Sequence, residues 1–159
     1  YQDGESGEFG ELRAYVMSKL LWDPKLDVEE LISDFMSAYY GDAAEQMSAY
    51  LDKLSTALKT TDKDWYLVDP VEMYKDVLTE ADITELDELW KTAESNTDGT
   101  AAYDRVRRSE IQWRYYKYLA GVCEFSDAGS KDAEYAKLLD DCAALGVTRL
   151  SESSMLANG

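Results

Sequence analysis

Apolar side chains recur along the chain at the three- and four-residue spacing of an α-helix, not at the alternate positions of a strand. The clearest stripe lies within 27–40, where Asp27 is placed to cap the helix and Gly41 to end it in a left-handed conformation. Its apolar members, all at helical spacing, are Val28, Leu31, Ile32, Phe35, Met36 and Tyr39. Segment 8–22 carries a similar stripe and is predicted to end before Pro24, because a residue that precedes proline avoids the helical region.

Four further helices are predicted along the rest of the chain, over 43–59, 79–93, 101–122 and 131–145. The helix over 101–122 is apolar on two sides, which is typical of a helix at the centre of a bundle. The pattern leaves two stretches open: 60–78, with a helical turn or two at its end, and the short polar tail 147–159. We therefore expect residues 1–159 to form a single all-α domain, an irregular bundle of five to six helices.

Composition adds mainly exclusions to this picture. The chain has 45% hydrophobic residues, enough for a packed core, and no apolar run approaches the roughly 20 residues of a membrane span. Its 33 acidic and 16 basic residues give a net charge of −17, which argues against nucleic acid or an anionic membrane as a partner. No histidine is present, so a Ser-His-Asp triad and a histidine-ligated metal are excluded. We predict no cofactor and no metal site.

The two cysteines offer no recognisable chemistry. Cys123 and Cys142 form no CxxC pair and no metal-ligand spacing. Two buried thiols or one disulfide would both fit, and buried thiols are favoured because free cysteine packs as a small hydrophobe. The chain begins with Tyr1 rather than Met, which favours a processed chain or a piece of a longer one.

Carboxylates were considered as catalytic groups, because glycosidases place two of them beside the bond that they cleave. The 33 acidic residues are scattered over the predicted solvent faces, so a solvated acidic surface is favoured and no catalytic residue is predicted. The calcium-ligand pattern of an EF-hand is absent, and its fragments at 96–99 and 62–64 are better interpreted as turns.

Basic residues gather on the helix that is predicted to be central, interleaved with aromatic residues. Arg105, Arg108 and Arg114 are members of this cluster. Arginine beside aromatic rings can bind an acidic sugar or a phosphate. The spacing of Asp104 with Arg108 and of Glu110 with Arg114 favours intramolecular ion pairs instead.

Aromatic residues near the N-terminal helices form a second candidate surface. Trp22, Tyr39 and Tyr40 are predicted to contact a neighbouring domain, because tyrosine and tryptophan combine a large apolar body with a polar tip. A sugar-stacking platform and an ordinary place in the core are the alternatives for these rings.

Two stretches carry a family resemblance: ELRAYVMSKLLWDP, residues 11–24, and DFMSAYYGDAA, residues 34–44. They resemble the C-terminal helical region of large bacterial proteins, often secreted, from a domain-of-unknown-function family. That family is glycoside-hydrolase-like, with an architecture similar to α-glucuronidases and hexosaminidases. A (β/α)8 barrel precedes the helical region there and carries the presumed catalytic carboxylates, so no catalytic residue is transferred to this chain.

The resemblance implies an accessory helical domain of a bacterial carbohydrate-active enzyme, a C-terminal fragment whose barrel is absent from this sequence. Its partner would be its own upstream catalytic domain and, through that domain, a glycan. The location would be extracellular or periplasmic. The alternative is a free-standing helical protein-interaction module, which would expose a large apolar patch. A third possibility, glycan hydrolysis by this chain alone, is not expected.

Overall fold

The computed structural model describes residues 7–61, 70–75, 77–122, 130–151 and 154–156, which fold as an all-α bundle. Within them lie seven α-helices, one 3-10 turn and two short strands. Their bounds are α1 (Gly10–Trp22), α2 (Val28–Tyr40), η1 (Gly41–Ala43), α3 (Ala44–Lys59), α4 (Pro70–Lys75), α5 (Glu80–Thr97), α6 (Tyr103–Ala120), α7 (Lys131–Leu145), β1 (Arg149–Ser151) and β2 (Ser154–Met155). The all-α prediction is confirmed, and the additional helix is the short α4, in a stretch that the pattern left open.

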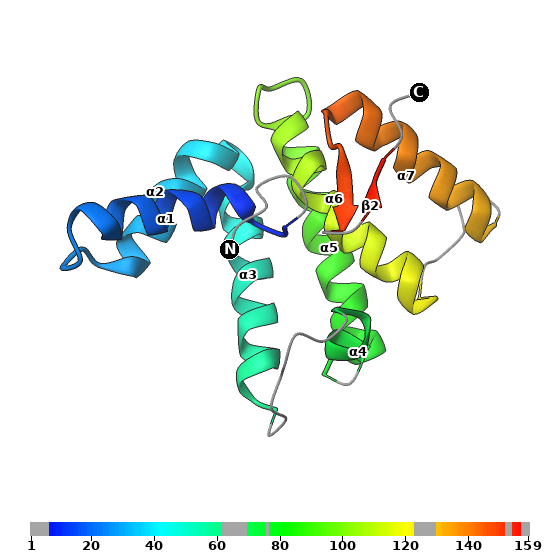
Figure 1. Ribbon diagram of the computed structural model, residues 1–159, viewed down its shortest axis with the longest axis horizontal. Helices are drawn as coiled ribbons and strands as arrows, with labels where there is room; N and C mark the ends of the chain where they lie inside the picture. Colours follow the sequence, from blue (N-terminus) through cyan, green and yellow to red (C-terminus); the bar gives the residue numbers. More distant parts are fainter. Residues whose placement is uncertain (1–6, 62–69, 76, 123–129, 152–153, 157–159) are drawn as a thin grey trace.

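The helices are arranged around α6 (Figure 1). α6 contacts α2, α4, α5, α7 and β1, which confirms the prediction that this helix is central. The α1–α2 hairpin projects to one side of the molecule, and α7 with the β1–β2 ribbon lies on the opposite side (Figure 1). The two strands are antiparallel, with Arg149 opposite Met155.

Helix ends follow the local sequence. The Asp27 carboxylate accepts two backbone N–H groups at the start of α2, and Thr79 forms a reciprocal capping box with Asp82 at the start of α5. Gly146 ends α7 with φ 69° in the left-handed region. Gly41 differs from the prediction: its φ is 55° but its ψ is −122°, because the chain turns directly into η1 instead of closing a left-handed cap.

A predicted turn and a predicted buried residue differ in the structure. α5 continues through Asn96 to Thr97, so the predicted turn begins later, and the Asn96 amide donates to Gln46 Oε1 on α3 at 3.2 Å. Val28, expected on the buried stripe of α2, is 40% exposed because the first turn of the helix extends beyond the core. The predicted turn over 62–64 lies outside the described residues.

The core has two parts. The larger part joins α1 to α6, and its largest fully buried side chains include Trp90, Trp113 and Tyr50. The smaller part lies beneath α7 and the ribbon, and its members are Ile111, Leu138, Cys142, Val147 and Leu150. The start of the polar tail therefore contributes to the core. Cys142 is a buried free thiol, and burial raises its pKa to about 11; Cys123 lies outside the described residues.

Candidate functional site

Large apolar side chains are exposed together where α1 is followed by α2. We call this surface the hairpin tip, and its members are Met17, Leu21, Trp22, Leu26 and Val28. Trp22 is 91% exposed and Leu21 is 85% exposed. Single exposed apolar residues are ordinary, but a group of five on one supersecondary unit is typical of a surface that binds a partner.

The sequence of α1 explains why the hairpin tip is exposed. Phe9 and Leu12, at the start of the segment, are buried in the main core. Met17 and Leu21 lie one helical turn apart on another side of α1, and Trp22 is the last residue of the helix. α1 therefore carries apolar side chains on two faces. One face packs in the main core, and no element among the described residues covers the other.

The other two aromatic residues predicted for a domain contact lie elsewhere. Tyr40 is 1% exposed, and its hydroxyl shares a 2.8 Å hydrogen bond with the Ser109 hydroxyl on α6. Burial raises the pKa of Tyr40 well above its ordinary value. Tyr39 is half-buried beside α6. The structure thus does not bring Trp22 together with these two tyrosines, and of the three only Trp22 is available to a neighbour.

The ring of Tyr39 belongs to a ladder that joins α1, α2 and α6. Tyr39 stacks on Phe35 with ring centroids 4.8 Å apart, and Phe35 packs against Tyr15 at 5.6 Å. The Arg105 guanidinium lies over the Tyr39 ring at 5.1 Å, and the Lys19 ammonium lies over Tyr15 at 5.4 Å. Because neighbouring groups occupy these ring faces, the ladder is not a sugar-stacking platform.

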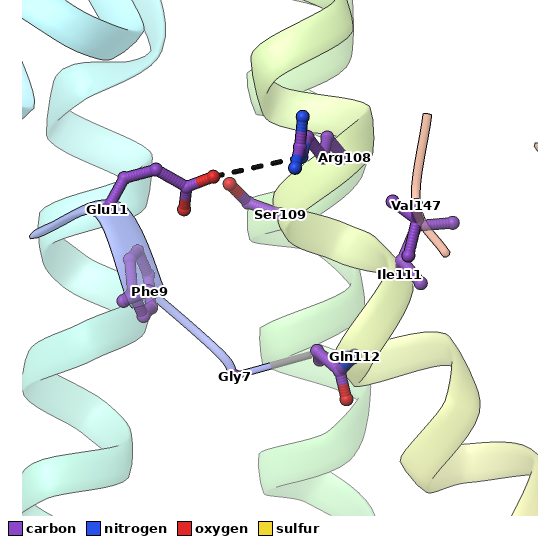
Figure 2. Close-up of a pocket in the computed structure, with 8 residues that line it drawn as sticks. All are labelled: Gly7, Phe9, Glu11, Arg108, Ser109, Ile111, Gln112 and Val147. Atoms are coloured by element: carbon purple, nitrogen blue, oxygen red, sulfur yellow. Dashed lines mark ion pairs between the residues drawn. The ribbon is translucent and has the colours of Figure 1, made fainter. Parts of the chain in front are cut away.

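The arginines of α6 do not form one cluster. Arg114 pairs with Asp141 on α7 at 2.6 Å and with Glu134 at 3.5 Å, whereas Arg108 faces Glu11 on α1 at 3.7 Å (Figure 2). Together with Arg105 over Tyr39, this arrangement points the three predicted residues toward different elements of the same chain. The contacts of Arg108 and Arg114 support their interpretation as members of intramolecular ion pairs, with partners that come from other helices, whereas Arg105 lies over an aromatic ring.

A groove lined almost entirely by charged side chains runs between α5, α6 and α7. We call it the charged groove; its volume is about 820 Å³, and its lining residues are Asp87, Glu88, Lys91, Glu94, Tyr103, Arg107, Glu110, Arg114, Lys117, Glu134, Lys137 and Asp141. Asp141 binds both Arg107 and Arg114. Burial alone would raise the pKa of Asp141, but the two guanidinium groups hold it below its ordinary value.

Two carboxyl groups of the charged groove face each other. Burial, followed by the charge of Glu94, raises the pKa of Glu110 to about 8, and the two side chains share a hydrogen bond. Arg114 and Lys117 oppose this shift. Two carboxyls in contact cannot both ionise readily, so the pair retains a proton near neutral pH. This pair has no signal in the sequence, because each residue alone resembles a solvated acid on its helix.

Other acids of the charged groove are bound by donors of the same chain. Asp87 accepts hydrogen bonds from Trp113 Nε1 at 2.6 Å and from Lys117 at 2.7 Å, so it is also satisfied within the chain. Across the described ranges, no three acidic or cysteine side chains are grouped so that they could hold a metal ion. No described helix combines the length and the apolar character needed to cross a membrane.

Comparison with known proteins gives one match. Residues 1–52 match a family model described as a domain of unknown function (DUF4838). The matched segment includes α1, α2 and the whole hairpin tip. No curated protein and no solved structure matches the chain. The resemblance to a domain-of-unknown-function family is therefore supported over this segment.

Proposed function

We propose that this chain is a helical accessory domain that packs against another domain of the same protein through the hairpin tip. The observation that carries the proposal is the exposure of Trp22 and Leu21, at 91% and 85%, inside the segment that matches the family model. Removing apolar surface from water contributes about 25 cal/mol per Å². A tryptophan and its apolar neighbours can therefore anchor a domain contact.

The surroundings of the hairpin tip also suit an interface. Its apolar centre is followed along the chain by exposed charged residues, Asp23, Lys25 and Asp27. An apolar centre with a polar rim is the usual arrangement of a protein interface. The acidic surface elsewhere on the chain keeps the remaining faces solvated.

The domain that covers the hairpin tip is, in this proposal, a glycoside-hydrolase-like barrel. Support comes from the resemblance of residues 11–24 and 34–44 to the helical region that follows such a barrel. Two acids of the charged groove, Asp87 and Asp141, are bound by cations of the same chain. In this proposal the glycan chemistry belongs to the barrel.

The test uses the longest gene product that contains this chain, with Leu21→Gln and Trp22→Gln combined. Loss of the apolar contact is expected to lower the Tm of the barrel transition and to make the junction between the domains more sensitive to protease. The matched control is Leu119→Gln, which changes an exposed leucine at the far end of α6 and is expected to have neither effect.

Two outcomes would decide against the proposal. The barrel contact is wrong if the double variant leaves the barrel Tm, the protease pattern and glycan hydrolysis as they are in the Leu119→Gln control. If the isolated chain forms a defined oligomer that the double variant dissolves, as measured by light scattering, the free-standing interaction module is the better description.

A further inference from the structure

Glu8 is a half-buried residue near the start of the described chain, and its carboxylate is held by two tyrosine hydroxyls. It belongs to the segment Gly7–Phe9 that leads into α1, which we call the strap. Its Oε1 accepts a hydrogen bond from the Tyr50 hydroxyl at 2.5 Å, and its Oε2 accepts one from the Tyr74 hydroxyl at 3.1 Å. Tyr50 lies on α3 and Tyr74 on α4, so two separate helices each supply one donor to the same carboxylate.

The surroundings of the carboxylate form an enclosed cage. Tyr50 is fully buried, and Tyr74 is 9% exposed. Trp90 packs edge-on against the Tyr50 ring with centroids 4.7 Å apart. Arg13 adds a favourable positive charge. Two phenolic donors and a nearby cation are a donor set that suits a carboxylate.

The strap is held in this cage at a cost. Phe9 has φ 51°, in the left-handed region that a bulky side chain rarely adopts. Burial removes water from the Glu8 carboxylate and raises its pKa. Between the strap and α6 lies a small cavity of about 20 Å³, bordered by Gly7, Phe9 and Arg108 (Figure 2). Strain and desolvation favour a strap that can move out, and the opposing cost is exposure of the Phe9 ring, which is 6% exposed in the main core.

We propose that Tyr50 and Tyr74 form a binding site for small carboxylates in which Glu8 is the intramolecular ligand. When the strap moves out, an acetate-sized carboxylate can take the place of the Glu8 side chain. The proposal does not depend on the domain contact at the hairpin tip, because the cage is formed by the strap, α3 and α4.

The test removes the intramolecular ligand and offers a free one. Glu8→Ala deletes a CH₂–COO⁻ unit, which has the size of acetate. Thermal unfolding of the chain is followed by circular dichroism at neutral pH and constant ionic strength, in sodium acetate or in sodium chloride at about 100 mM. We expect acetate to raise the Tm of the variant by about 3 °C relative to chloride. Formate should give a smaller rise, and butyrate, which exceeds the vacated space, should give none.

Two controls identify the site. Combining Glu8→Ala with Tyr50→Phe should abolish the acetate effect, because one of the two donors is lost. Glu11→Ala, which removes a more exposed carboxylate on α1, should show no preference for acetate over chloride. Glu8→Gln fills the cage with an amide and should also be insensitive to acetate.

The proposal is overturned if Glu8→Ala responds equally to acetate and chloride, or if the acetate effect survives in the double variant. Should Glu8→Ala be unfolded in chloride, acetate is expected to restore its helical signal, because a ligand that binds only the folded state shifts the folding equilibrium. Absence of that recovery would likewise overturn it.

Discussion

The hairpin tip belongs to the α1–α2 hairpin and the charged groove runs between α5, α6 and α7, and both depart from the usual distribution of side chains. The hairpin tip exposes apolar groups to water, whereas the groove withdraws carboxylates from it. In the groove Asp141 is compensated inside the chain by Arg107 and Arg114, and Asp87 is compensated by Lys117. At the hairpin tip no described residue covers Trp22. The contrast fits the proposal made above, in which the groove serves the fold and the tip serves a contact outside it.

The ion pairs of the charged groove connect α6 to α7. α7 rests on α6 through the smaller part of the core, and the Asp141 ion pairs cross the same boundary. The side chains of Asp141 and Arg114 are only 15% and 13% exposed, so an unpaired charge there would be poorly solvated. Removing one partner of these ion pairs should therefore lower the free energy of unfolding, unlike the loss of an ion pair on the open surface.

The largest expected effect is that of Asp141→Ala. This substitution leaves Arg107 and Arg114 without their shared carboxylate, and we expect a loss of about 2 kcal/mol in the free energy of unfolding. The corresponding fall in Tm is about 6 °C. Urea unfolding followed by tryptophan fluorescence gives the free energy. The neighbouring Asp140→Ala, at an exposed position of α7, is the control and should change it by less than about 0.5 kcal/mol. Equal effects of the two variants would show that the groove does not stabilise α7.

A smaller effect is expected from the pH dependence of the Glu94–Glu110 pair. Because the folded pKa of Glu110 is raised from 4.5 to about 8, its contribution to stability is complete below pH 4.5 and is lost as the pH rises through 8. We expect the free energy of unfolding to fall by about 1 kcal/mol between pH 5 and 8, since the open groove screens part of the shift. The absence of histidine removes the side chain that ordinarily titrates in this range.

Glu110→Gln tests this assignment. The variant should show a flatter profile between pH 6 and 8 and should be more stable than the wild-type chain at pH 8. Glu88→Gln, which changes an exposed carboxylate of the same groove, should keep the wild-type profile. Glu8, whose pKa is also raised by burial, contributes in the same direction and is unaffected by either change. An unchanged slope in Glu110→Gln would rule out the shared proton.

Local sequence determined the helices but not the partners of their side chains. The cap at Asp27, the capping box at Thr79 and the stop at Gly146 are encoded within a few residues, so the helix boundaries could be predicted. Tyr39 and Tyr40 are adjacent in sequence, yet only the position of α6 decides that Tyr40 is buried against Ser109. No feature of the neighbouring sequence predicts this contact.

The candidate sites show the same limit. The residue type of Trp22, a large apolar ring with a polar tip, suggests a domain contact, but its exposure depends on the absence of a covering element among the described residues. Glu8 resembles an ordinary acidic residue at a helix start, and its cage appears only when Tyr50 and Tyr74, 24 residues apart along the chain, approach it. Glu94 and Glu110 meet for the same reason, through the contact of two helices. The pattern of apolar and polar positions therefore does not predict long-range contacts between polar groups.

The smallest expected effect is that of Leu21→Gln and Trp22→Gln in the isolated chain. Both side chains are almost fully exposed, and glutamine is a good helix former, so the folded state loses little contact and little helix propensity. We expect the free energy of unfolding to change by less than about 0.5 kcal/mol, measured by urea unfolding, even though the change removes two large apolar groups. A loss as large as that of Asp141→Ala would mean that the hairpin tip stabilises this domain internally, and the contrast with the charged groove would fail. A neutral result here, combined with a destabilised barrel in the longest gene product, would place the role of these residues in the contact between domains.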